Sequence, residues 1–188
     1  TFITRRCFEQ VAIDLCLHNL PVRLIGNGGG VVYAPLGPTH LAIEDFALFR
    51  ALPNMAIVAV SDAEEMKRLM PATVSWPGPL YIRLGKGGDR VISRPDDDFR
   101  IGKALLRRRE TASLTVLLVS TGIMTSRALD AANLLEARGI GCRVLHMHTV
   151  KPLDTAAIDH HGADARLIVT IEEHVRTGGL GSAVAEHL

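Results

Sequence analysis

The sequence has 188 residues, of which 47% are hydrophobic and only 4% aromatic, so we expect a core of Ala, Val, Ile and Leu. The net charge of +1 gives no electrostatic reason to bind nucleic acid or a membrane surface. No apolar run reaches the length of a membrane span, and no signal peptide is visible. Cys7, Cys16 and Cys142 lie in apolar segments without metal or redox spacing, which is typical of buried thiols in a reducing cytoplasm.

Helical and strand patterns alternate along the first half of the chain, as in α/β proteins with mostly parallel strands. Apolar periodicity and turn residues set the bounds of the expected elements. In order, these are a helix with an apolar stripe from Phe8 to Leu15, a strand over residues 22–25, a helix over 42–51, a strand over 56–60, a helix starting at a Ser61–Glu64 capping box and a strand over 80–84.

The stretch 85–100 changes character, because it contains three glycines and an acidic run, and it predicts a connection between two units. A second α/β pattern follows, with strands over 114–119, 141–145 and 167–171 and a helix that ends at Gly139. We therefore predict two consecutive three-layer α/β units with mostly parallel sheets. The predicted division is a first unit over 1–92, a linker over 93–101 and a second unit over 102–188.

The glycine-rich loop that follows the first predicted strand suggests a dinucleotide site, but its neighbours exclude one. The third glycine of that fingerprint would fall at Val31. Pro35 and Pro38 come next, so no helix can begin there to hold a phosphate at its N-terminus. The loop is better interpreted as a turn or as a close approach of backbone to a ligand.

Three other features are open to both a structural and a functional interpretation. His40 follows a turn on the side of the sheet where α/β proteins bind ligands, although a lone histidine there is more often structural. Arg83 ends a strand beside flexible glycines, which suits either a phosphate contact or a surface ion pair. His146 and His148 lack a third ligand at metal-binding spacing, so no metal site is predicted in this chain.

Taken in order, short motifs along nearly the whole chain resemble the pyrimidine-binding and C-terminal domains of the transketolase family. The motifs are Thr1-Phe2, Phe8-Glu9-Gln10, Leu20-Pro21-Val22, Gly37-Pro38-Thr39-His40, Glu44-Asp45, the run from Arg50 to Met55, Ser61-Asp62, Tyr81-Ile82-Arg83, the run from Thr149 to Asp154, Glu172-Glu173-His174 and Gly178-Gly179-Leu180-Gly181. The resemblance implies a thiamin-diphosphate-binding fold, with a pyrimidine module incomplete at its N-terminus and a truncated C-terminal unit.

The resemblance also implies roles for five residues. Phe2 matches the aromatic side chain that stacks on the aminopyrimidine ring, and Arg5 and Phe8 lie at helical spacing from it, so all three are expected to bind cofactor. His40 matches the histidine that contacts sugar hydroxyls or moves protons, and is the expected catalytic residue. Arg83 matches the arginine that binds the substrate phosphate.

Departures from the family pattern bear on the substrate. Transketolases proper carry an acidic residue where this chain has Leu36, and Gly28 falls near the place of a polar side chain. A leucine cannot accept the hydrogen bond of a donor hydroxyl, so the ordinary ketose phosphate donor is in doubt. The chain is more similar to split, two-gene transketolase-like proteins than to the housekeeping enzyme.

The family's catalytic glutamate lies upstream of Thr1, and its Gly-Asp-Gly…Asn motif for the diphosphate and Mg²⁺ is not in this sequence. We therefore expect an N-terminal section or subunit as partner, in a homo- or hetero-oligomer such as a dimer. The assembled enzyme would transfer a ketol unit between sugar phosphates, and this chain by itself would be inactive. Two alternatives stay open. One is a subunit like 1-deoxyxylulose-5-phosphate synthase, which Arg5 favours, or like a 2-oxoacid dehydrogenase; the other is a non-catalytic paralogue or assembly module.

Overall fold

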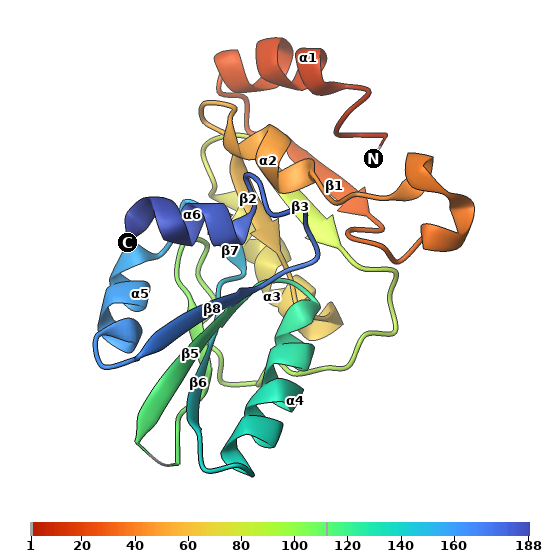
Figure 1. The fold of residues 1–188 in the computed structure, drawn as a ribbon. Coiled ribbons are helices and arrows are strands. Elements are labelled where there is room, and N and C mark those ends of the chain that lie inside the picture. Colours follow the sequence, from red (N-terminus) through yellow and green to blue (C-terminus); the bar gives the residue numbers. More distant parts are fainter. Residues whose placement is uncertain (1, 112) are drawn as a thin grey trace.

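The computed structural model describes residues 2–111 and 113–188, which form two four-stranded sheets with helices on both faces of each (Figure 1). This is the predicted pair of α/β units. In each sheet three strands are parallel and one edge strand is antiparallel. The parallel strands carry near-continuous apolar runs because both of their faces are covered.

The first sheet has the strand order β1-β3-β2-β7. Its strands are β1 (Arg23–Asn27), β3 (Leu80–Leu84), β2 (Ala56–Ala59) and β7 (Thr149–Lys151). One face is covered by α1 (Phe8–Gln10), the π-helical segment η1 (Val11–Leu17) and α2 (Asp45–Arg50), and the other by α3 (Ala63–Val74).

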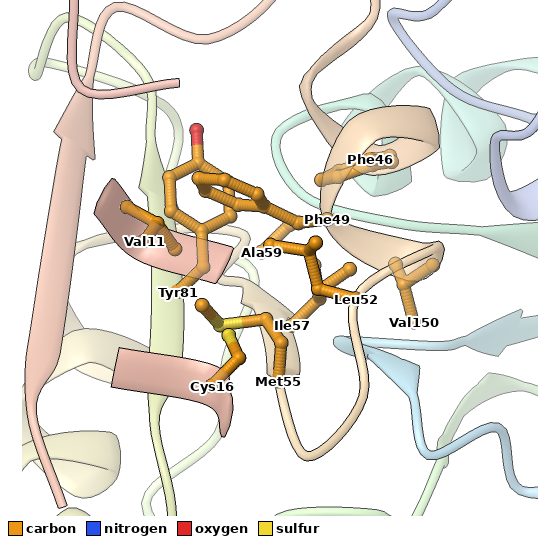
Figure 2. Packing of buried hydrophobic residues seen from close by; sticks show 10 residues of the cluster. All are labelled: Val11, Cys16, Phe46, Phe49, Leu52, Met55, Ile57, Ala59, Tyr81 and Val150. Carbon is orange, nitrogen blue, oxygen red and sulfur yellow. The ribbon is translucent and has the colours of Figure 1, made fainter. Parts of the chain in front are cut away.

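Successive side chains of β2 point to opposite faces of this sheet and so contribute to the hydrophobic core on each face. Ile57 and Ala59 pack with Phe49 and Tyr81 beneath α2 and η1 (Figure 2), whereas Val58 packs toward α3. The rings of Phe49 and Tyr81 meet edge to face at 4.8 Å. A rigid sheet is thereby fixed beneath the loops that leave its strand ends.

The second sheet has the order β4-β6-β5-β8. Its strands are β4 (Leu105–Arg108), β6 (Gly141–His146), β5 (Leu114–Ser120) and β8 (Leu167–Ile171). Helix α4 (Met124–Glu136) covers one face, and α5 (Thr155–Gly162) and α6 (Leu180–His187) cover the other (Figure 1).

Helix α3 begins one residue later than its predicted capping box. Asp62, not Ser61, is the N-cap, and its Oδ1 accepts the Glu65 N–H at 3.0 Å. Asp62 also accepts two backbone N–H groups and the hydroxyl of Ser93, and Glu65 accepts the Ser61 N–H at 2.6 Å. The Ser61–Glu64 pairing was therefore wrong, because Glu64 is part of the exposed face and Glu65 points inward.

Two connections join the halves of the chain. Strand β7 comes from the second half but pairs with β2 of the first sheet. Beside it, the buried carboxylate of Glu65 on α3 lies 2.9 Å from His146 Nε2 on β6 and 3.5 Å from Arg107 on β4. Burial alone would raise the pKa of Glu65, but the charge and hydrogen bond of His146 outweigh it and lower the pKa to about 2.

Candidate active site

Phe2 and His40, 38 positions apart in the sequence, meet in the structure. Their ring centroids lie 5.3 Å apart with the rings at 89°, and the Arg6 guanidinium lies over the Phe2 ring at 4.8 Å. The Phe2 side chain is nevertheless 46% exposed. A half-open aromatic face beside an imidazole is a surface on which a flat heteroaromatic ring can stack.

His40 owes its position to the irregular loop between β1 and α2. The loop forms two short 3₁₀ helices, η2 (Ala34–Leu36) and η3 (Pro38–His40), and turns between them at Gly37, whose φ of 82° favours glycine. His40 ends η3, and its Nδ1 lies 3.0 Å from Thr39 Oγ1. The turn at Gly37 and the contact with Thr39 therefore set the position of the imidazole.

Arg5 ties the N-terminal segment to the chain that follows His40. It donates to the Leu41 carbonyl at 2.6 Å and forms an ion pair with Glu44. Phe8, at the start of α1, packs against the core under α2 and η1 instead. Residues 2–7 form turns, so Phe2 does not share a continuous helix face with Phe8. The cofactor contacts expected of Arg5 and Phe8 stay predictions.

Two cavities border the Phe2 ring. One of about 310 Å³ is lined by Arg5, Arg6 and Thr39 together with Phe2. The other, of about 190 Å³, runs along the end of β1, with walls that include Ile3, Ile25 and Tyr81. The Phe2 ring therefore lines two separate cavities.

Arg83 lies deeper than a surface contact would require. Its side chain is 7% exposed, and its Nε lies 3.1 Å from the carboxylate of Asp45, which is fully buried. Asp45 also accepts the Tyr81 hydroxyl at 2.8 Å, and the Arg83 guanidinium lies 4.5 Å from the Phe46 ring centroid. The surface ion pair considered from the sequence is thus an internal one. The proposed phosphate contact is untested by this geometry.

Asp45 and Arg6 were missed as contributors to the site. Asp45 was noted only as part of a motif, and its burial beside Arg83 depends on α2 lying across β3. Arg6 follows Arg5 and has no sequence signal of its own; only the turn at residues 2–7 brings it over Phe2. His146 and His148 are buried between the halves, away from Phe2.

The fold and this loop define a class: an α/β protein with two sheets and an aromatic–imidazole pair beside cavities at one sheet edge. The model of the transketolase pyrimidine-binding domain matches residues 1–88, and that of the transketolase C-terminal domain matches residues 102–188. The chain belongs to the transketolase family.

Several relatives are split-gene proteins. The chain is 37% identical over its whole length to an apulose-4-phosphate transketolase subunit from Phocaeicola vulgatus, covering 59% of that protein. It is 37% identical to a 6-deoxy-6-sulfo-D-fructose transketolase subunit from a Clostridium species, again over the whole chain and 57% of the relative. The chain thus spans just under three fifths of these relatives.

A solved structure described as a split gene transketolase, an inactive β4 tetramer, superposes with a TM-score of 0.89 at 37% identity, over all of this chain and 59% of that one. The chain is also 35% identical to the 1-deoxy-D-xylulose-5-phosphate synthase of Dictyoglomus turgidum, over 99% of this chain and 30% of that protein. No helix within residues 2–111 and 113–188 is both long and apolar enough to cross a membrane.

Proposed function

We propose that this chain is the C-terminal section of a thiamin-diphosphate-dependent, transketolase-like enzyme that transfers a ketol unit between sugar phosphates. The observation that carries the proposal is the contact between the exposed Phe2 ring and the His40 imidazole beside two cavities. The split-gene relatives support a partner: an N-terminal section that would bind the diphosphate and Mg²⁺.

The residues around Phe2 suit the aminopyrimidine part of the cofactor. The ring is half exposed, and the adjoining walls include the apolar side chains of Ile3 and Ile25 and the ring of Tyr81, which suit a heteroaromatic ring. When bound, thiamin diphosphate supplies the electron sink for cleavage of the ketose carbon–carbon bond. Phe2 would hold the pyrimidine, and Arg5 would fix the segment that carries Phe2 against Leu41.

His40 has the position for proton transfer at the sugar. Thr39 engages Nδ1, which leaves Nε2 to hydrogen-bond a sugar hydroxyl or to take its proton. Arg83 is the proposed partner of the substrate phosphate at the end of β3. Leu36 is 59% exposed and offers no acceptor to the substrate, so the donor sugar should differ from that of transketolases with a carboxylate there.

The alternative of a deoxyxylulose-phosphate-synthase-like activity is supported by Arg5 and by the similarity to the Dictyoglomus enzyme. Measuring whether the assembled enzyme forms 1-deoxy-D-xylulose 5-phosphate or transfers a ketol unit between sugar phosphates separates the two activities. A protein that does neither would favour the non-catalytic paralogue.

The dependence on a partner is tested by calorimetry of the full-length protein that contains this chain. We expect no tight Mg²⁺-dependent binding of thiamin diphosphate and no turnover until the N-terminal partner is added, because the diphosphate needs a metal site from that section. The description of the similar solved structure as inactive supports this expectation. Tight binding by the protein alone would reject it.

The role of His40 is tested by His40→Ala in the reconstituted enzyme. Turnover should fall about 100-fold or more, the scale of general acid–base catalysis, while cofactor affinity changes little. His18→Ala, at an exposed histidine at the C-terminal end of η1, is the matched control. Unchanged turnover in His40→Ala would remove His40 from the site.

A further inference from the structure

We propose that Glu173, His174 and Val175, named here the clasp, position His40 from the C-terminal half of the chain. The inference rests on the proposed role of His40. The clasp follows β8 of the second sheet, yet it contacts the segment that leaves η3 and enters α2. Figure 1 shows this connection running from β8 toward α2 before it enters α6.

Backbone hydrogen bonds fasten the clasp to the chain just after His40. The Val175 N–H donates to the Ile43 carbonyl at 2.7 Å. Arg83 adds a bridge, since its Nη2 donates both to the Ala42 carbonyl at 2.6 Å and to the Glu173 carbonyl at 2.7 Å. Of the two residues that follow Leu41, Ile43 is therefore bonded to the clasp directly and Ala42 through Arg83.

The side chain of His174 extends the contact to α2. Its ring stacks on Phe46 with centroids 5.3 Å apart and planes within 7°. Its Nε2 accepts the Ala47 N–H at 3.3 Å, and its Nδ1 lies 2.6 Å from the Val175 carbonyl. Because the carbonyl can only accept, Nδ1 carries the proton and Nε2 is free to accept, so the two contacts require one tautomer of a neutral imidazole.

The Glu173 side chain of the clasp also packs on the loop residue that pairs with Ala42. Gly30 and Ala42 exchange two backbone hydrogen bonds of 2.8 and 3.0 Å. A Cβ on Gly30 would lie 2.4 Å from Glu173 Oε2, and Gly30 has a φ of 66°. Glycine is therefore required at this position, where the Glu173 side chain packs directly on the loop.

The clasp is itself anchored, so it can fix what it touches. Glu172, the residue before it, accepts the N–H groups of Leu180 and Gly181 at the start of α6. Arg50 at the end of α2 donates to the carbonyls of Gly178 and Gly179. The chain from 172 to 181 is thus held at both ends.

These contacts hold Ala42 and Ile43, the second and third residues after His40. An imidazole that transfers a proton must stay within hydrogen-bond reach of the substrate, and a displacement of about 1 Å can cost about 100-fold in rate. The C-terminal half therefore contributes to turnover without touching substrate. Val175, through its N–H, is a positioning residue.

The test is Val175→Pro in the full-length protein reconstituted with its N-terminal partner. Proline removes the donor to Ile43, whereas the control Val175→Ala keeps it. We expect kcat to fall about 10- to 100-fold in Val175→Pro, with Km and cofactor affinity within about twofold, and no change in Val175→Ala. Circular dichroism melting shows whether each variant is folded.

The decisive measurement combines each change with His40→Ala. If the clasp acts through His40, Val175→Pro causes no further loss in the His40→Ala background. An equal further loss would overturn the clasp but leave the role of His40 intact, whereas a His40→Ala protein with full turnover would overturn the proposed function instead. Should Val175→Pro not fold, His174→Phe replaces it: the ring stays on Phe46 but the acceptor for Ala47 is lost. Wild-type kcat in His174→Phe would then reject the clasp.

Discussion

At the scale of single residues, Arg83 combines a buried ion pair with the proposed contact to the substrate phosphate. Its guanidinium is the ionic partner of Asp45, a carboxylate with no exposed surface, and it also reaches the carbonyls of Ala42 and Glu173. Burial of the ring and the charge of Asp45 raise the pKa of Tyr81 far above its usual value, so the hydroxyl stays protonated and donates to that carboxylate. Removing Arg83 leaves a buried charge without its cation.

Arg83→Met should lower the free energy of unfolding by about 3–5 kcal/mol, the cost of an uncompensated buried charge. The double change Arg83→Met/Asp45→Asn should recover part of that loss, because no charge remains, and denaturant unfolding measures both. In the reconstituted enzyme both variants should raise Km for phosphorylated sugars only. An equal rise in Km with unphosphorylated sugars would contradict the phosphate contact. A double variant as unstable as Arg83→Met alone would contradict the role of the ion pair in stability.

At the scale of elements, apolar runs predicted the parallel strands well, because strands covered on both faces must be apolar throughout. β7 and β4 escaped prediction for physical reasons. β7 has only three residues and is a strand through its pairing with β2, a distant partner. β4 is an edge strand that contains two arginines, Arg107 and Arg108, so its sequence lacks an apolar run. Both arginines form ion pairs with distant residues, Arg107 with Glu65 and Arg108 with Glu136.

The candidate site, too, could be predicted only in part from the sequence. The resemblance assigns Phe2 to the cofactor and His40 to the substrate, and in the structure the two rings contact each other. The clasp was not foreseen, although Glu172-Glu173-His174 had been noted as a motif, because its partners lie 90 or more residues earlier in the chain. Sequence order alone does not show which strand end of the second sheet faces which loop of the first.

At the scale of the whole molecule, a buried polar cluster joins the halves where hydrophobic packing would be expected. It contains Glu65, His146 and Arg107, with His148 5.7 Å from His146 by ring centroids. Burial, and then the charge of His146, lower the pKa of His148 to about 4. His148 is therefore neutral at pH 7, and its ring stacks on Phe99 at 4.3 Å.

This burial predicts a loss of stability in mild acid. In the unfolded chain His148 takes up a proton near pH 6.5, but in the folded protein only near pH 4. The unfolded state therefore binds more protons between these values, so stability falls as pH falls from 6.5 to 4 and is fully retained above 6.5. The difference amounts to at most about 3 kcal/mol.

His148→Phe should remove most of this pH dependence while keeping the ring stacked on Phe99. Denaturant unfolding of the full-length protein at pH 7, 6, 5 and 4.5 gives the slope, and His18→Gln, at an exposed position, is the control that should leave it unchanged. Glu65 cannot produce the same slope, because its low folded pKa, about 2, places its loss of stability between about 4.5 and 2. If His148→Phe kept the wild-type slope above pH 4.5, the acid sensitivity would have to arise elsewhere, and the junction between the halves would not be its source.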